Sequence, residues 1–182
     1  MKSILLSIRP QWVEKILNGE KTIEVRKQFP KDYVGWVYIY CSKATKSNER
    51  LLGNHKDNYR YHTTNDHIDF YSDYMLRNIV NGKVVARFWC DNVEEITTEK
   101  WSPSKEQDLL KASCLTENQL FDYCNLESGK PFYAIHISKL EIFDRPKYLS
   151  EYYKTYIETE KGIYYQVLTK APQNYCYIEG EE

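Results

Sequence analysis

The chain has 182 residues, of which 42% are hydrophobic and 28% are charged, and its formal net charge at pH 7 is −1. This length and composition favour one folded domain over 1–182 and exclude disordered and fibrous proteins. No apolar run approaches the roughly 20 residues that a membrane-spanning helix needs, and the opening residues lack a signal-peptide pattern. We therefore expect a cytoplasmic protein with no membrane partner.

The cysteines and histidines do not predict a metal site. The cysteines, odd in number and without a Cys-x-x-Cys pair, are Cys41, Cys90, Cys114, Cys124 and Cys176. Zinc sites need closely paired ligands, and the cysteines and histidines of this chain do not supply that pattern. The sequence also has no Gly-x-Gly-x-x-Gly fingerprint, no P-loop and no Gly-x-Ser-x-Gly turn. We therefore predict no metal, no nucleotide cofactor and no other cofactor.

The first 42 residues predict a strand, a helix and two further strands. Pro10 suits the first position of a helix, an apolar stripe follows at helical spacing, and Gly19 suits the helix end. Alternation of apolar and polar residues indicates the strands. The predicted elements are strand 3–8, helix 10–18, strand 21–28 and strand 35–42.

Three charged side chains converge where this helix meets the next strand. Glu24 and Arg26 are two residues apart, so they leave the same side of the strand, about 7 Å apart at a rise of roughly 3.3 Å per residue. Lys21 lies at the corner before them. One interpretation is an exposed strand face with a surface ion pair worth about 0–1 kcal/mol. The other is a functional site, in which Glu24→Ala abolishes binding and changes the thermal midpoint by only a few degrees.

The rest of the chain predicts a long polar loop followed by strands and helices. Residues 43–70 contain many turn formers and few apolar side chains, which is typical of an insertion. Thr116 and Gln119 have the spacing of a capping box. The other predicted elements are strands 83–96, 131–143 and 173–179 and helices 104–112 and 116–125. This pattern, without a β-α-β rhythm, predicts an α+β fold with a mixed, mostly antiparallel β-barrel and a few flanking helices.

Tyrosine is abundant, with 17 residues, and we interpret two groups differently. The first recurs at roughly helical spacing and is predicted to cover the barrel: Tyr148, Tyr152, Tyr153 and Tyr156. Tyr133 and Tyr175 lie in predicted strands, and we expect their rings to wall a pocket beside Glu24. His136 is three residues beyond Tyr133 and should face the opposite side of the strand, as a structural or a catalytic histidine.

The motif Gly-x-Lys-x-x-Glu-x-Arg at 19–26, preceded by the segment Ile4–Pro10, is the most distinctive pattern in the sequence. Residues 38–43, 133–138 and 171–177 follow it with further similarity. Together these segments resemble the ASCH domain of phages and bacteria, a family that has a PUA-like fold and is inferred to bind RNA. The resemblance is weakest over 44–80 and 151–168, and we predict that 151–168 diverges from the family.

The resemblance implies that RNA or a modified nucleoside binds in the cleft between the first helix and the barrel. Glu24 would accept a hydrogen bond from an exocyclic amine, as carboxylates do from cytosine N4. The other contacts that we expect are polar ones from Lys21, Arg26, Ser42 and Lys43 and stacking on Tyr133 or Tyr175. A protein partner is unknown; a further alternative is a barrel whose surface, at the tyrosine-rich segment 148–165, binds another protein.

The alternative is an enzyme. Small bacterial ASCH proteins include amidohydrolases that deacetylate N4-acetylcytidine with a lysine and a threonine of this motif and a downstream glutamate. Lys21 matches the lysine, but Glu24 stands at the threonine position and would have to activate water instead; Thr22 is displaced along the strand. The downstream carboxylate is left open among Glu94, Glu95 and Glu106. Ribonuclease activity by the same charged motif is a further alternative.

Overall fold

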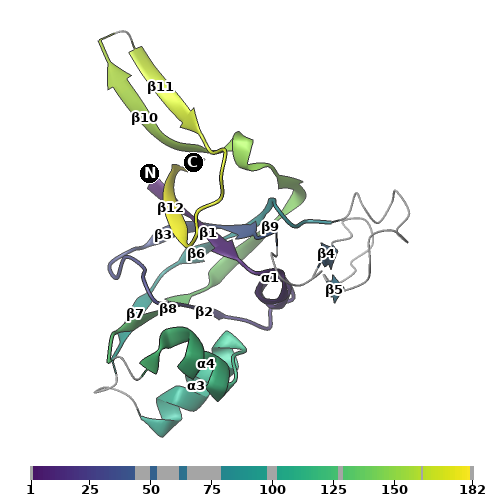
Figure 1. Ribbon diagram of the computed structural model, residues 1–182, viewed down its shortest axis with the longest axis vertical. Coiled ribbons are helices and arrows are strands. Elements are labelled where there is room, and N and C mark those ends of the chain that lie inside the picture. The colour runs from purple at the N-terminus through teal and green to yellow at the C-terminus, as the bar shows by residue number, and fades with distance from the viewer. Residues whose placement is uncertain are drawn as a thin grey trace.

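The computed structural model describes residues 2–43, 50–52, 62–64, 79–97, 102–126, 129–160 and 162–180. Its strands form sheets of five, three, two and two strands. The elements labelled in Figure 1 are, in chain order, β1 (Lys2–Ile8), α1 (Pro10–Leu17), β2 (Ile23–Arg26), β3 (Gly35–Cys41), β4 (Arg50–Leu52), β5 (His62–Thr64), β6 (Val84–Cys90), β7 (Val93–Ile96), α3 (Pro103–Ser113), α4 (Glu117–Cys124), β8 (Phe132–His136), β9 (Ser138–Lys147), β10 (Tyr153–Thr159), β11 (Gly162–Val167) and β12 (Tyr175–Glu179). A short 3-10 turn, Leu149–Glu151, precedes β10.

A five-stranded sheet in the order β12-β1-β3-β6-β9 forms the centre of the molecule. β1 pairs in parallel with β3, and the other pairs in this sheet are antiparallel. Ile4 and Leu6 of β1 belong to one buried cluster, whereas Leu5 belongs to another on the opposite face. Alternate residues of a strand point to opposite faces, so the continuous apolar run in β1 is buried on both sides.

A three-stranded sheet, β2-β8-β7, lies between the central sheet and the helices α3 and α4 (Figure 1). Ile135 of β8 belongs to the same buried cluster as Ile4 of β1, whereas the adjacent Ala134 packs with Leu120 of α4. The small sheet is therefore covered on both faces. Each side chain of β2 therefore points either toward the central sheet or toward α3 and α4.

Helix α4 begins with the capping box that the sequence predicts. Gln119 N donates to Thr116 Oγ1 at 3.2 Å, and Thr116 N donates to Gln119 Oε1 at 3.0 Å. We expect Thr116→Ala to lower the free energy of unfolding by about 1 kcal/mol, because the N–H of Gln119 loses its partner. Urea denaturation measures this change. Thr169→Ala, at an exposed loop position, is the control and should stay within about 0.5 kcal/mol; an equal result for both variants would contradict the prediction.

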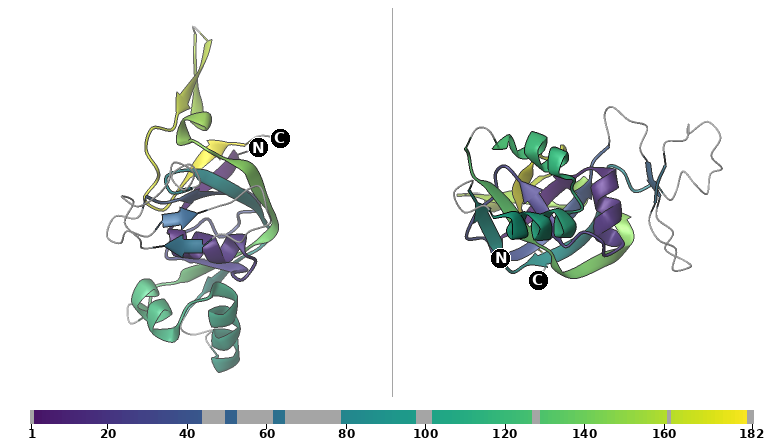
Figure 2. Two further views of the ribbon diagram at one scale, coloured as in Figure 1. Left: turned by 90° about the vertical axis from the view of Figure 1, so that its right-hand side faces the viewer. Right: turned by 90° about the horizontal axis from the view of Figure 1, so that it is seen from below.

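The strands β10 and β11 lie in and just after the segment where the sequence has tyrosines at roughly helical spacing. β10 and β11 pair antiparallel, and the hairpin extends away from the two large sheets (Figures 1 and 2). The expectation that these tyrosines cover the barrel holds only in part. Tyr152 does cover the central sheet and is buried with Leu5, but Tyr148 and Tyr153 are exposed.

The predicted loop 43–70 contains two strands that the sequence pattern did not indicate. β4 and β5 pair antiparallel, and Leu51 is fully buried in the cluster that contains Ile4. The other parts of this loop, 44–49, 53–61 and 65–70, lie outside the described residues.

The predicted fold class is confirmed, because mostly antiparallel strands combine with a few short helices in an α+β arrangement. Within the described part of the chain, the helices are too short or too polar to cross a membrane.

Candidate functional site

The turn after helix α1 fixes the start of β2. Gly19 has a φ of +74°, a conformation that favours glycine, and it follows the last residues of the helix. Lys21 N donates to Lys15 O at 3.1 Å, and Thr22 N donates to Ala112 O at 2.8 Å. The entry to β2 is therefore held by α1 on one side and by the end of α3 on the other.

Alternation along β2 separates its apolar and charged residues. Val25 packs in the cluster beneath α3 and α4, so Glu24 and Arg26 point the other way, toward the central sheet. This confirms that the two charged residues share one side of the strand. Lys21, Glu24 and Arg26 are only 3%, 5% and 8% exposed, however, so the interpretation as an exposed strand face is wrong. Sheet and helix residues distant in sequence cover this face.

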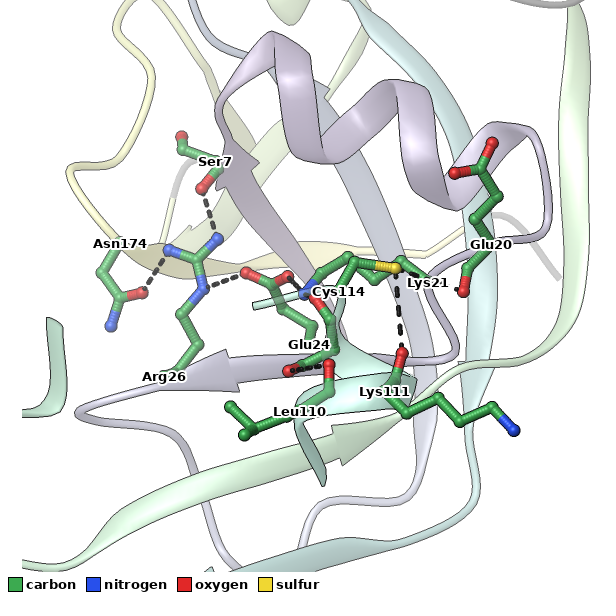
Figure 3. Close-up of polar contacts among 10 residues, drawn as sticks. Ser7, Glu20, Lys21, Glu24, Arg26, Leu110, Lys111, Cys114 and Asn174 are labelled. Atoms are coloured by element: carbon green, nitrogen blue, oxygen red, sulfur yellow. Dashed lines mark hydrogen bonds and ion pairs between the residues drawn. The ribbon is translucent and has the colours of Figure 1, made fainter. Parts of the chain in front are cut away.

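The three side chains form one buried ionic cluster (Figure 3). Glu24 Oε1 lies 2.9 Å from Arg26 Nε, and Glu24 Oε2 lies 3.3 Å from Lys21 Nζ. Two cations thus share one carboxylate, which leaves the cluster with a formal charge of +1. Buried charges are tolerated when they are paired and hydrogen-bonded, and the remaining contacts of the cluster meet that condition.

Each cation is also bonded to a distant part of the chain (Figure 3). Lys21 Nζ donates to Ser113 O at 2.6 Å, at the end of α3. Arg26 Nη2 donates to Ser7 O of β1 at 2.6 Å, and Arg26 Nη1 donates to Asn174 Oδ1 at 3.2 Å. The Nε–H of Arg26 is close to Glu24 but has no aligned hydrogen-bond acceptor among the described residues. The cluster therefore ties β2 to β1, to α3 and to the segment before β12.

A cavity of about 360 Å³ opens over this cluster. Among the described residues, its charged lining consists of Glu24 and three cations, Arg9, Lys21 and Arg26, and its aromatic lining consists of Trp12 and Tyr123. Cavities of this size hold small ligands, with a few polar groups that fix the orientation. The excess of positive charge favours a ligand that carries negative charge.

The two rings are coupled to the charged groups. Lys21 Nζ lies 5.4 Å from the centre of the Trp12 ring, within the range of a cation–π contact. Burial raises the pKa of Tyr123, Arg26 opposes the rise, and Glu24 adds to it. The Tyr123 hydroxyl therefore stays neutral at ordinary pH and can both donate and accept hydrogen bonds.

The other predicted contacts are placed differently. Ser42 lines the cavity, and Lys43 lines a neighbouring hollow. Tyr133 and Tyr175 line neither, so the expectation that their rings wall a pocket beside Glu24 is wrong.

Both tyrosines are engaged elsewhere. Tyr133 pairs with Arg26 across β8 and β2, but its hydroxyl donates to Glu95 Oε1 of β7 at 3.1 Å. The ring of Tyr175 packs against Phe29, with ring centres 5.5 Å apart. The polar contact and the ring packing turn both side chains away from the cavity.

Sequence reasoning missed the two aromatic residues that do line the cavity. Trp12 lies next to Val13 of the apolar stripe in α1, and its position before the charged motif was the available signal. Tyr123 belongs to α4, roughly 100 residues after the motif, and nothing local in the sequence indicates that it reaches the cavity.

The carboxylates considered for an enzyme do not line this cavity. Glu94 and Glu95 line a second cavity of about 270 Å³ between α3 and the three-stranded sheet, together with His136. His136 and Tyr133 therefore face opposite sides, as predicted. Glu106 lies in the first turn of α3 and lines neither cavity. Within the described residues, no three His, Cys, Asp or Glu side chains are placed to hold a metal ion.

No protein-family model matches the sequence, and no curated protein matches it. Solved structures do match the fold. An ASCH protein from Zymomonas mobilis is similar at a TM-score of 0.51 and 15% identity, over 81% of this chain and 73% of that one. A serine-to-alanine variant of the Zymomonas mobilis protein gives a TM-score of 0.58 at 14% identity, over 97% of this chain and 88% of that one. A tyrosine-to-phenylalanine variant gives a TM-score of 0.52 at 15% identity, over 82% of this chain and 77% of that one. The chain therefore has the ASCH-domain fold, the fold of the family that its opening motif resembles.

Proposed function

We propose that this protein binds RNA or a modified nucleoside by its base, in the cavity over the buried cluster. The observation that carries the proposal is the Glu24 carboxylate, which is buried between two cations at the wall of a 360 Å³ cavity. Burying three charges is costly, and replacing such a cluster with apolar residues is often neutral or stabilising. A cluster kept in this form at a cavity wall is well explained by binding.

Glu24 has the free capacity to act as the acceptor. A carboxylate offers about four lone-pair sites, and among the described residues two cations lie against Glu24. An exocyclic amine, such as N4 of cytosine, would donate to a remaining site. Lys21 and Arg26 hold the carboxylate in place, because each is fixed by a backbone carbonyl. Trp12 and Tyr123 supply the rings on which an unstacked base packs.

The resemblance to the ASCH family supports the same class of ligand. The Gly-x-Lys-x-x-Glu-x-Arg motif, through which that resemblance is strongest, supplies three of the four charged residues of the cavity. The motif is a property of the sequence alone, whereas the cavity also depends on α1, α4 and the segment before β12. Their coincidence favours binding at this cavity over the second one.

Hydrolysis of an N4-acylated cytidine is the alternative, favoured by the 3.3 Å separation of Lys21 Nζ and Glu24 Oε2. In that reaction Glu24 would take a proton from water while the water oxygen attacks the acyl carbon. The bond between that carbon and N4 would then break as Glu24 returns the proton to N4, giving cytidine and the free acid. Against it, Lys21 already donates to Ser113 O, and no second carboxylate lines the cavity within the described residues. We therefore place binding first. Mass spectrometry of N4-acetylcytidine incubated with the protein decides between the two.

The test of binding compares the protein with its Glu24→Gln variant. Calorimetric titration with cytidine, adenosine, uridine and N4-acetylcytidine should identify a nucleoside that binds, and Glu24→Gln should weaken its binding about tenfold or more, because a hydrogen bond to a charged group is lost. Glu20→Gln, a neighbouring exposed acid paired with Lys15, is the control. Circular dichroism verifies that each variant is folded at the titration temperature. Equal affinity of Glu24→Gln and the unmodified protein would overturn the proposed site.

A further inference from the structure

The neighbouring hollow that Lys43 lines, of about 730 Å³, adjoins the cavity over the buried cluster and is more open to solvent. The two share three residues of their lining, Ser7, Ser42 and Gln173. The two are therefore neighbours, the smaller one over Glu24 and the larger one on the other side of these shared residues. We call the 730 Å³ hollow the outer groove. It lies between Ser42 and Lys43, which follow β3, and the segment that connects β11 to β12.

The outer groove carries positive charge. Lys43 and Lys170 belong to its lining, and no acidic residue does within the described part of the chain. The stem of Lys43 lies across Gly82, where an added Cβ would come within 3.2 Å of Lys43 Cε. Gly82 has a φ of +79° and donates its N–H to Cys41 O, so the close approach is fixed by the backbone. The stem of Lys43 thus packs along the backbone of Gly82 at the groove, and the residue is exposed.

An exposed ring stands at the edge of the same groove. Tyr148 lines it and is 58% exposed, and Lys83 Nζ lies 5.7 Å from the centre of the ring. Tyr148 N donates to Glu151 Oε1 at 2.7 Å, and Glu151 is paired with Arg145 at 2.8 Å. The backbone under the ring is therefore fixed while the ring itself faces solvent. Rings next to lysines are the combination that holds single-stranded nucleic acid.

We propose that the outer groove holds the backbone and the next base of a single-stranded RNA whose first base occupies the cavity at Glu24. This inference rests on the proposed function, and it specifies the ligand as a strand rather than a free nucleoside. Lys43 and Lys170 contact the phosphates that follow the bound base, and Tyr148 stacks on its neighbour. An acidic peptide would match the lysines as well, but the groove adjoins the cavity that holds Glu24, and an ionised acidic side chain has no hydrogen to donate to that carboxylate, whereas a base amine does.

The experiment compares nucleosides with short strands. Cytidine, adenosine and uridine and their homotetranucleotides are titrated against the protein at several salt concentrations. We expect the tetranucleotide of the preferred base to bind at least about tenfold more tightly than the nucleoside. Lys170→Ala should reduce that advantage and lower the slope of log affinity against log salt by about 0.7, the value for one phosphate of a single strand. Tyr148→Ala should weaken tetranucleotide binding about fivefold or more.

Matched variants outside the groove serve as controls. Lys31→Ala removes an exposed lysine, and Tyr164→Ala removes an exposed ring of the β10–β11 hairpin. Neither residue lines the groove, and neither variant should change the advantage of the tetranucleotide.

The outcomes separate this inference from the proposed function. If a nucleoside binds but its tetranucleotide binds no more tightly, or if Lys170→Ala and Lys31→Ala behave alike, the outer groove is not a strand site and the cavity proposal stands. If tetranucleotides bind and Glu24→Gln binds them equally well, the cavity proposal fails and the groove remains. If neither nucleosides nor tetranucleotides bind, both are overturned, and an acidic peptide becomes the ligand to examine.

Discussion

Replacing Glu24 with alanine is expected to lower the free energy of unfolding by about 3–5 kcal/mol, the range for breaking a buried ion pair by removing one partner. The variant leaves Lys21 and Arg26 buried, close together and without a counter-charge. For a chain of this size the thermal midpoint should fall by about 6–20 °C. Sequence spacing alone suggested a change of only a few degrees, and burial of the cluster reverses that expectation.

Urea denaturation of Glu24→Ala and Glu20→Ala tests this point directly. Glu20 is also paired with a lysine, Lys15 at 3.4 Å, but the two side chains are 49% and 38% exposed. The Glu20 variant should therefore lose no more than about 1 kcal/mol. A Glu24 variant as stable as the Glu20 variant would mean that water reaches the two cations and that the cluster is not buried in solution.

Replacing Leu120 with alanine is expected to lower the free energy of unfolding by about 2–5 kcal/mol, because the variant leaves a cavity beneath α4. Leu120 is 1% exposed and packs with Val25, Leu109 and Phe132 between the helices and the three-stranded sheet. The same helices carry Ser113, whose carbonyl holds Lys21, and Tyr123, whose ring lines the cavity. We therefore expect weaker nucleoside binding in this variant as well.

Phe121 offers a matched control in the same helix. It is 42% exposed, so Phe121→Ala removes a larger side chain with less buried contact and should cost clearly less than Leu120→Ala. Urea denaturation gives both values, and titration with the preferred nucleoside gives the effect on binding. If Leu120→Ala lost stability but bound the nucleoside normally, the helical layer would support the fold without shaping the site.

Local patterns predicted those elements that depend on local interactions. The stripe and stop signals of α1 and the capping box of α4 each involve residues within one or two turns, and the structure has both. The β10–β11 hairpin was missed because tyrosines spaced three or four apart suggest a helix, whereas Tyr156 pairs across the hairpin with Tyr165. The strands β4 and β5 were missed because each has three residues, too few for a period to show. A single domain over 1–182 stays a prediction.

In the candidate site, too, the sequence predicted what depends on neighbouring residues and not what depends on distant ones. Spacing predicted that Glu24 and Arg26 share one side of a strand, because that follows from the backbone alone. Their burial could not be predicted, since it depends on Ser7 and Asn174, and the partner of Lys21 is Ser113, 92 residues further on. For the same reason, sequence reasoning did not find Trp12 and Tyr123, the rings that line the cavity.

The most direct test of the central claim is the tryptophan side-chain NMR spectrum of the protein, recorded with and without the nucleoside that binds most tightly. Trp12 lines the cavity, whereas the rings of Trp36 and Trp89 pack against each other elsewhere in the fold, with their centres 5.4 Å apart. Trp12→Phe assigns the Trp12 signal. We predict that the nucleoside shifts the Trp12 indole N–H and leaves those of Trp36 and Trp89 in place. A bound nucleoside that moves the Trp36 and Trp89 signals and not that of Trp12 would contradict the assignment of the cavity at Glu24 as the binding site.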